Sequence, residues 1–317
     1  MKNIDIIIPV YNEASAVDRL RSALETVFEE MRGFSFNLIF VDDGSTDGTL
    51  LKLLEWQKQS PKITIIELTR NFGKEAAITT GLSQSKGDAC ILFDADLQDP
   101  VDLIKNLANE WVAKEVDIVL ARRSNYDSDP YYRRVFRFLF YKFFNALSRQ
   151  NPPDNVGDTR LLSARVVEAV MLLKERNRYM KGLMNWVGFE HCIIDFTREK
   201  RVDGVSKFNF WKLWNFALEG IFSNSSLPAR IWLYIGCFFF LAGLLLSTVV
   251  FFDVLINGVS VPGYASLAIL ISVFGGIHLI AIGVLGEYIG RIFIEVQARP
   301  ISLIKEIHVF KKKRKNL

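Results

Sequence analysis

The stretch "ACILFDADLQDP", residues 89–100, joins an apolar run to a cluster of carboxylates. The apolar run reads as a buried strand, and Asp94, Asp96 and Asp99 follow it directly. Carboxylates crowded at the end of a buried strand repel one another and are costly to remove from water. The cluster is therefore stable only if hydrogen-bond donors or a cation balance its charge.

Around this stretch, short β-branched runs alternate with longer segments of helical spacing. The expected strands are residues 4–8, 36–41, 63–67, 89–93 and 116–120, and the expected helices are 14–31, 47–59, 73–85 and 101–114. Such alternation predicts an α/β fold with a Rossmann-like, mostly parallel sheet. Because ligands of these sheets bind beyond the carboxyl ends of the strands, we expect the polar segments after four of the strands to share one edge.

A divalent cation is the simplest group that could neutralise the carboxylates after residue 93. Asp94 and Asp96 are two residues apart, so in an extended segment they point the same way. Gln98 offers a neutral oxygen at the next alternate position, and Mg²⁺ and Mn²⁺ both prefer oxygen ligands. A polar turn is the alternative interpretation, and we expect Asp99, before Pro100, to be a helix N-cap.

The segment "VDDGSTDGT", residues 41–49, is open to a similar choice. Gly44 and Gly48 permit a tight turn, and Ser45, Thr46 or Asp47 can cap the next helix. Capping does not explain Asp42 and Asp43 together at the end of a strand, which favours hydrogen bonding to a ligand. The chain has neither G-x-G-x-x-G nor G-x-x-x-x-G-K-[ST], so a dinucleotide site and a P-loop are disfavoured.

The C-terminal third has the composition of a membrane protein. Uncharged runs of 22 and 33 residues lie on either side of Asp253, and we place membrane-spanning helices near 231–256 and 264–288, with a turn at 257–263. Residues 230–317 hold nine Lys or Arg and four Asp or Glu, so their net charge is +5. The loop between the spans has no Lys or Arg, which predicts that both termini are cytoplasmic.

These patterns divide the chain into four parts. We expect a cytoplasmic domain at 1–205, a juxtamembrane amphipathic helix at 206–229, two transmembrane helices at 230–290 and a cytoplasmic basic tail at 291–317. The aromatic segment 130–150 carries arginines at 133, 134 and 137 and fits a helix in the membrane interface, or a buried helix with snorkelling arginines. "KKKRK" (311–315) fits a solvated tail or a contact with anionic lipid.

Several motifs together resemble a known family. "IPVYNE" (8–13), "VDDGSTDGT", "RNFGKEAAITTGL" (70–82) and "DADLQDP" (94–100) occur in the order and spacing of family-two glycosyltransferases. "RVDGVSKFNFWKLW" (201–214) and "LGEYIGRIFIEVQARP" (285–300) narrow the resemblance to the polyprenyl-phosphate glycosyltransferases. This group includes bactoprenol glucosyltransferases and dolichyl-phosphate mannose and glucose synthases, and it implies a GT-A type nucleotide-sugar-binding fold.

The resemblance implies roles for residues on the donor side. Pro9, Tyr11 and Glu13 would line the nucleotide pocket, and Asp42 or Asp43 would read the base. Lys74 would lie near this pocket, unless it is only a solvated helix start. Asp94 would lie near the ribose or the metal, whereas Asp96 and Gln98 would hold Mg²⁺ or Mn²⁺ against the diphosphate. Arg201 and Lys207 would close over the diphosphate, or would meet lipid headgroups.

A second set of residues would serve the acceptor, a lipid phosphate that is already anionic near neutral pH. The expected phosphate ligands are arginines, namely Arg122, Arg123, Arg133, Arg134 and Arg137. Asp158 would lie beside the acceptor as the candidate base, with Arg160 near it. A purely structural pair of Asp158 and Arg160 is the alternative.

The resemblance implies inverting transfer of a sugar, first of all glucose from UDP-glucose, to a polyprenyl phosphate. Transfer of mannose or an aminopentose is the closest alternative. A processive polysaccharide synthase is a further one, although the Q-x-x-R-W motif typical of those enzymes is missing. An inactive membrane scaffold is the non-enzyme alternative. We expect an integral protein of the bacterial inner membrane, in contact with the bilayer and with no nucleic-acid partner, and a homo-oligomer is possible.

Overall fold

The computed structural model describes residues 1–124, 156–176, 178, 180–197 and 263–310, with isolated positions between 236 and 256. The chain divides into two compact units. The first contains the described residues up to 197 and those from 299 onward, and the second contains the long helix α10, Tyr264–Gln297.

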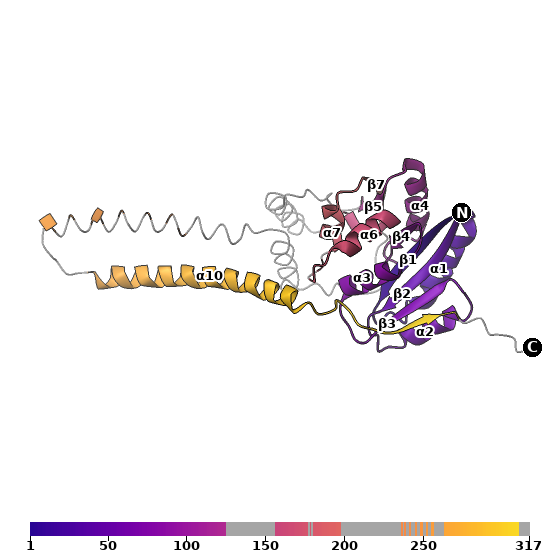
Figure 1. The fold of residues 1–317 in the computed structure, drawn as a ribbon, viewed down its shortest axis with the longest axis horizontal. Helices are drawn as coiled ribbons and strands as arrows, with labels where there is room; N and C mark the ends of the chain where they lie inside the picture. Colours follow the sequence, from indigo (N-terminus) through magenta and orange to yellow (C-terminus); the bar gives the residue numbers. More distant parts are fainter. Residues whose placement is uncertain are drawn as a thin grey trace, which may run out of the picture. The chain divides into compact units, whose positions relative to one another are not determined.

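The first unit is built on one eight-stranded sheet with the order β7-β5-β6-β4-β1-β2-β3-β8 (Figure 1). Its strands are β1 (Lys2–Val10), β2 (Phe34–Asp42), β3 (Ile63–Leu68), β4 (Ala89–Leu92), β5 (Ile118–Arg123), β6 (Val156–Ser163), β7 (His191–Phe196) and β8 (Ile304–Val309). Every pair among β1 to β4 that is adjacent in the sheet is parallel, and β5 pairs in parallel with β7. The predicted mostly parallel α/β sheet is therefore confirmed.

Helices cover both faces of the sheet, as apolar strands without a solvent face require. On one face, α1 (Val17–Glu30), α2 (Thr49–Gln57) and α4 (Asp102–Lys114) pack on alternate strand residues such as Ile6 and Phe40. On the other face, α3 (Lys74–Gln84), α6 (Ala164–Leu172) and α7 (Met180–Trp186) pack on residues such as Ile7 and Val41. All these strand side chains are fully or almost fully buried, so the polar residues of interest must lie at strand ends.

Three strands were not predicted from the sequence, and β6 matters most for the site. It runs antiparallel between β4 and β5, with Arg160 opposite both Leu92 and Leu120. Because β6 is antiparallel, its first residues lie at the edge where β4 ends. That edge therefore receives side chains from the beginning of β6 as well as from the ends of its neighbours.

Strand β8 comes from the segment predicted to be a basic tail. It pairs antiparallel with β3 at the edge of the sheet, although 235 residues, including those of α10, separate the two strands in the sequence (Figure 1). Two further bonds hold it: Gln57 Nε2 donates to the carbonyl of His308 at 2.6 Å, and Thr69 N donates to that of Leu303 at 3.0 Å. The chain beyond α10 therefore returns to the sheet, whereas residues 311–317 lie outside the described part.

Helix α10 corresponds to the second predicted membrane span but is longer, because it continues to Gln297. Within the described residues it is the one helix long and apolar enough to cross a membrane, over the 24 residues Phe274–Gln297 with a mean hydropathy of 1.6. The first predicted span, 231–256, lies largely outside the described residues. The predicted helices at 130–150 and 206–229 lie outside them entirely.

The buried carboxylate of Asp5 fixes the turn that leads into β4. It accepts hydrogen bonds from the backbone N–H groups of Lys86 and Gly87 at 2.7 and 2.8 Å. It also accepts one from Ser85 Oγ and one from Asn37 Nδ2, both at 2.9 Å. These hydrogen bonds fix the conformation of the turn, and through it the start of β4 and the position of the side chains that follow β4.

Replacement of Asp5 by alanine is expected to lower the free energy of unfolding by about 3 kcal/mol, because it removes the acceptor of four partly buried hydrogen bonds. Urea unfolding of the purified protein measures the change. Asp88→Ala is the matched control, since Asp88 accepts from Asn3 N at an exposed position. Equal losses for the two variants would show that Asp5 does not hold the turn.

Candidate active site

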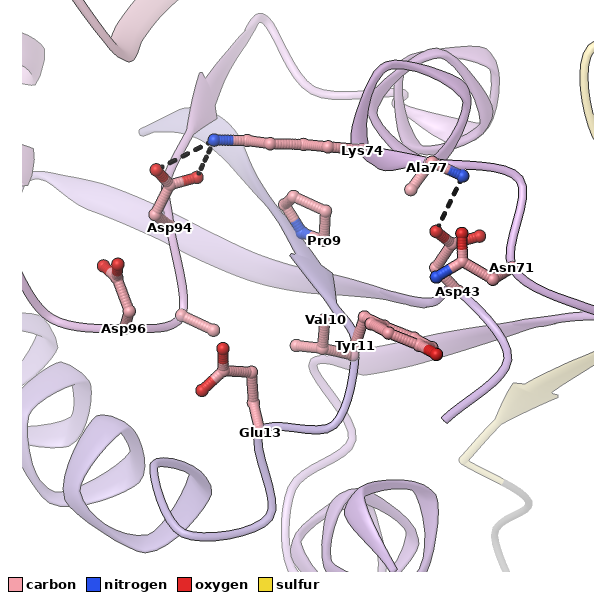
Figure 2. Close-up of a pocket in the computed structure, with 12 residues that line it drawn as sticks. Pro9, Val10, Tyr11, Glu13, Asp43, Asn71, Lys74, Ala77, Asp94 and Asp96 are labelled. Atoms are coloured by element: carbon pink, nitrogen blue, oxygen red, sulfur yellow. Dashed lines mark hydrogen bonds and ion pairs between the residues drawn. The ribbon is translucent and has the colours of Figure 1, made fainter. Parts of the chain in front are cut away.

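A cleft opens at the carboxyl edge of the sheet, with a cavity volume of about 290 Å³. It is lined by Pro9, Val10, Tyr11, Glu13, Asp43, Asn71, Gly73, Lys74, Ala77, Asp94, Ala95 and Asp96. Figure 2 shows Glu13, Asp94 and Asp96 along one side and Tyr11, Asp43 and Asn71 along the other. The ends of β1, β2, β3 and β4 thus supply one site, as the parallel sheet predicts.

The acidic side of the cleft brings together carboxylates that repel one another. The pKa of Glu13 is raised by burial and then by the negative charges of Asp96, Asp47 and Asp94. Gln98 is not among the residues that line the cleft, and it donates both its backbone N–H, at 3.1 Å, and its side-chain amide to Asp96. Three carboxylates with an amide beside them form an oxygen-rich set of the kind that Mg²⁺ and Mn²⁺ prefer, so these residues fit a divalent cation.

Lys74, the first residue of α3, supplies a positive charge to this acidic side (Figure 2). Its Nζ lies 2.7 Å from Asp94 Oδ1 and 2.7 Å from Asp158 Oδ2. Burial alone would lower the pKa of Lys74, but the two carboxylates outweigh burial and raise it. Burial raises the pKa of Asp94, and Lys74 opposes that shift. Lys74 therefore stays charged, and Asp158 reaches the site through it, although Asp158 does not line the cleft itself.

The two aspartates at the end of β2 have different surroundings. Asp43 lines the cleft and accepts hydrogen bonds from Phe72 N at 2.7 Å and Gly73 N at 2.9 Å. Asp42 is 1% exposed and accepts from Ser45 N at 3.3 Å. Burial raises the pKa of both carboxyls. Asp43 is thus the one of the pair with access to a ligand, while both hold the loops that form the cleft.

The turn after β2 is hydrogen-bonded to the turn after β1. Asn12 N donates to Ser45 Oγ at 3.0 Å, and the Asn12 side chain accepts from Thr46 N at 2.8 Å. Asp47 accepts from Thr49 N at 3.0 Å, at the start of α2, and from Ala14 N at 3.1 Å. These bonds position the segment that carries Tyr11 and Glu13.

Asp99 does not occupy the predicted capping position. Helix α4 begins at Asp102, and its N-cap residue is Val101. Asp99 is 6% exposed and accepts a hydrogen bond from Thr159 Oγ1 at 2.6 Å. The prediction was wrong because Pro100 and Val101 precede the helix, and because β6 brings Thr159 to a carboxylate 60 positions earlier.

The predicted arginines take other partners. Arg122 donates from Nε and Nη2 to the carboxylate of Asp195 on β7, at 2.6 and 2.9 Å. Arg160 is buried and donates to the carbonyls of Gly157 at 2.7 Å and Asp158 at 3.2 Å. Arg123 is partly buried, and none of the three is among the residues that line the cleft. Arg133, Arg134, Arg137, Arg201 and Lys207 lie outside the described residues.

Several cleft residues were not singled out from the sequence. Asn71 and Gly73 belong to the segment "RNFGKEAAITTGL", in which the sequence predicts only Lys74 as a residue near the pocket. Their signal was present, because a glycine before a helix after a strand often marks a special backbone conformation: Gly73 has φ +97°. Val10, Ala77 and Ala95 are small or apolar, and no local pattern identifies such residues as lining a site.

A second group of potential metal ligands lies outside the cleft lining, between β3 and β8. Glu67, Glu306 and His308 bring one ligand atom each within 4.8 Å of one another. Lys305 Nζ, at 2.6 Å, already neutralises Glu67. We therefore assign no metal to this group and treat it as part of the pairing that holds β8.

Comparison with known proteins gives a consistent result. The model of glycosyl transferase family 2 matches residues 5–171. The SfII prophage-derived bactoprenol glucosyl transferase of Shigella flexneri is 44% identical over 305 residues, which cover 96% of this chain and 98% of that protein. The prophage bactoprenol glucosyl transferase homolog of Escherichia coli K12 is 42% identical over 304 residues, covering 96% and 99%.

Among solved structures, the mannosyltransferase PcManGT of Pyrobaculum calidifontis, in complex with GDP-Man and Mn²⁺, is 18% identical to this chain. The TM-score is 0.47, and the alignment covers 93% of this chain and 86% of that one. At this similarity, neither the donor nor the metal of that complex carries over to this chain.

Proposed function

Because this chain belongs to glycosyl transferase family 2, we propose that it transfers a sugar from a nucleotide sugar to a polyprenyl phosphate, with glucose as the first expectation. The main support is the identity of 44% with a bactoprenol glucosyl transferase, which extends over nearly the whole length of both proteins. Such coverage leaves only about 12 of the 317 residues unaligned, so it includes α10 as well as most of the sheet. Two proteins that share all these parts are expected to share an acceptor class.

The cleft supports the donor side of this proposal. Its acidic side would hold a divalent cation through Asp94, Asp96 and Gln98, and that cation would neutralise negative charge on the departing diphosphate. Tyr11 and Asp43, on the opposite side, would contact the nucleoside (Figure 2). Glu13 adds a third carboxylate beside the cation, and all of these residues except Gln98 line one cavity.

On the acceptor side, the reaction needs the lipid phosphate to be oriented correctly more than it needs a strong base. The lipid phosphate is already anionic near neutral pH. In an inverting reaction, one of its oxygens forms a bond to the anomeric carbon as the bond from that carbon to the diphosphate breaks. Asp158, which pairs with Lys74 and does not line the cleft itself, would be the carboxylate beside the acceptor. Arg122 would bind the phosphate only if Asp195 released it.

The apolar helix α10 supports a location at the membrane, where the acceptor is. Its 24-residue stretch Phe274–Gln297 is long enough to span a hydrocarbon core of about 30 Å. We place the catalytic domain and both termini on the cytoplasmic side, from the distribution of Lys and Arg. A bacterial inner membrane is the location that these features fit best.

A donor screen tests the proposed function. Purified protein in lipid is mixed with Mn²⁺ or Mg²⁺, undecaprenyl phosphate and labelled UDP-glucose, GDP-mannose or a UDP-aminopentose. We expect label from UDP-glucose to enter an organic-extractable product, with the β configuration that inversion of an α-linked donor requires. If only label from GDP-mannose entered the extractable product, the proposed acceptor would be supported and the transferred sugar would be mannose instead of glucose. The absence of extractable product with every donor would refute the proposal.

A further inference from the structure

Lys74 joins two carboxylates that belong to different halves of the proposed reaction. Asp94 follows β4 and lines the donor cleft, whereas Asp158 is on β6, outside the lining. The Lys74 ammonium is 2.7 Å from each of them. The bridge depends on the topology, because the antiparallel course of β6 brings Asp158 to the edge where β4 ends.

The backbone before Lys74 is held firmly enough to aim its side chain. Gly73, the N-cap residue of α3, has φ +97°, a conformation that glycine adopts without strain. The carboxylate of Asp43 accepts the N–H groups of both Phe72 and Gly73. Immediately after Lys74, α3 is anchored by the buried residues Ala77 and Ile78. The lysine therefore projects from a fixed point, and its ammonium is a defined feature of the cleft.

A shared cation makes the positions of the two carboxylates depend on each other. If Lys74 were removed, two negative charges would face each other across the space that its ammonium fills, and they would move apart. The side chains of Asp94 and Asp158 are 23% and 40% exposed, so solvent weakens this repulsion without removing it. The displacement would be borne by Asp158, the more exposed of the two.

We propose that Lys74 is a positioning residue that holds Asp158 toward the donor cleft, so that the carboxylate beside the acceptor is aligned with the bound donor. This inference rests on the proposed function, because it takes Asp158 as the acceptor-side carboxylate. It assigns Lys74 a role beyond lining the donor pocket. Lys74 acts through Asp158, so its contribution appears in kcat, the turnover rate of the enzyme with its substrates bound.

Kinetics of Lys74→Met and Lys74→Arg test this role. Misplacement of a reacting group by about 1 Å costs on the order of 100-fold in rate, so Lys74→Met is expected to lower kcat by about that factor. The KM for the nucleotide sugar is expected to change by much less. Lys74→Arg keeps a cation able to reach both carboxylates and should recover part of kcat. A loss confined to the donor KM would overturn the proposal in favour of simple donor binding.

A double-mutant cycle with Asp158→Asn separates this role from an independent one. If Lys74 acts through Asp158, Lys74→Met should cost little further rate in the Asp158→Asn background. If the fold losses in kcat of the two single variants multiplied in the double variant, the proposal would be overturned. Lys52→Met is the matched control, because Lys52 forms a bridge of 2.6 Å with Asp18 between α1 and α2, outside the cleft lining. That variant should retain the wild-type kcat.

The bridge is also testable without turnover, which keeps this inference distinct from the proposed function. In thermal unfolding, the loss of Tm in the double variant Lys74→Met/Asp158→Asn should be smaller than the sum of the two single losses. Additive losses would show that the bridge does not form, whatever the enzyme transfers. Non-additive losses in a protein that makes no sugar lipid would refute the proposed function and retain the bridge.

Discussion

Replacement of Asp96 by asparagine is expected to lower the rate of sugar transfer by about three orders of magnitude. Asp96 faces the cleft beside Glu13, and Gln98 donates to it twice. The neutral amide of asparagine keeps the size of the side chain and removes one of the charges that would hold a divalent cation. Loss of one group that stabilises developing charge costs about 100- to 1,000-fold, and loss of the cation itself lies at the upper end of this range.

The measurement is the initial rate of sugar-lipid formation at saturating Mn²⁺, together with the rise of Tm on addition of Mn²⁺ alone. Both should be lost in Asp96→Asn. Asp102→Asn is the matched control, because Asp102 is an exposed aspartate six residues later that pairs with Lys105 on α4 at 2.9 Å. Wild-type turnover by Asp96→Asn would remove Asp96 from the metal site.

The local patterns were sufficient to predict the elements that carry the cleft. The run at 89–93 became β4, Ala89–Leu92, and the carboxylates after it face the cleft as the rule for parallel sheets predicts. The shared edge of the polar segments after β1 and β2 could be predicted in the same way, because it depends only on local periodicity and on the direction of the strands. The family resemblance then named Pro9, Tyr11, Glu13 and either Asp42 or Asp43 within them, and of the two aspartates it is Asp43 that lines the cleft.

The position of Asp158 could not be predicted in the same way. Nothing in "NVGDTRLLS" indicates that β6 lies between β4 and β5, because strand order is a property of pairings between distant segments. The contact of Asp158 with Lys74 spans 84 positions, and the bond of Thr159 to Asp99 spans 60. The contact of Asp158 with Lys74 and the wrong prediction of a helix cap at Asp99 therefore have one cause, the antiparallel insertion of β6.

Strand β8 escaped prediction for a different physical reason. Its sequence, "IKEIHV", is short, and as an edge strand it has a largely exposed side-chain pattern that local analysis assigns equally well to a tail. Its pairing with β3 joins residues about 240 positions apart. The charges that mark a basic tail, Lys305 among them, instead serve the sheet, since Lys305 pairs with Glu67.

Replacement of Gly44 by alanine is expected to destabilise the protein by about 3 kcal/mol and to abolish most activity. Gly44 has φ +72°, which costs an alanine on the order of 1–2 kcal/mol. A Cβ atom there would also lie 2.7 Å from the carbonyl carbon of Arg70 and 2.8 Å from Asn71 N. These are backbone atoms of the loop that leads to Lys74, so relief of the contact must move the loop and the lysine with it.

Gly48→Ala separates strain from steric contact in this prediction. Gly48 has φ +90° in the same turn, but a Cβ atom there would meet nothing within 4 Å. Gly48→Ala should therefore show only the conformational cost, with kcat near the wild-type value. Urea unfolding and the rate of sugar-lipid formation measure both variants. Equal stability and equal activity of the two would mean that the loop at 70–71 yields easily, and that contact with Gly44 does not hold the lysine in place.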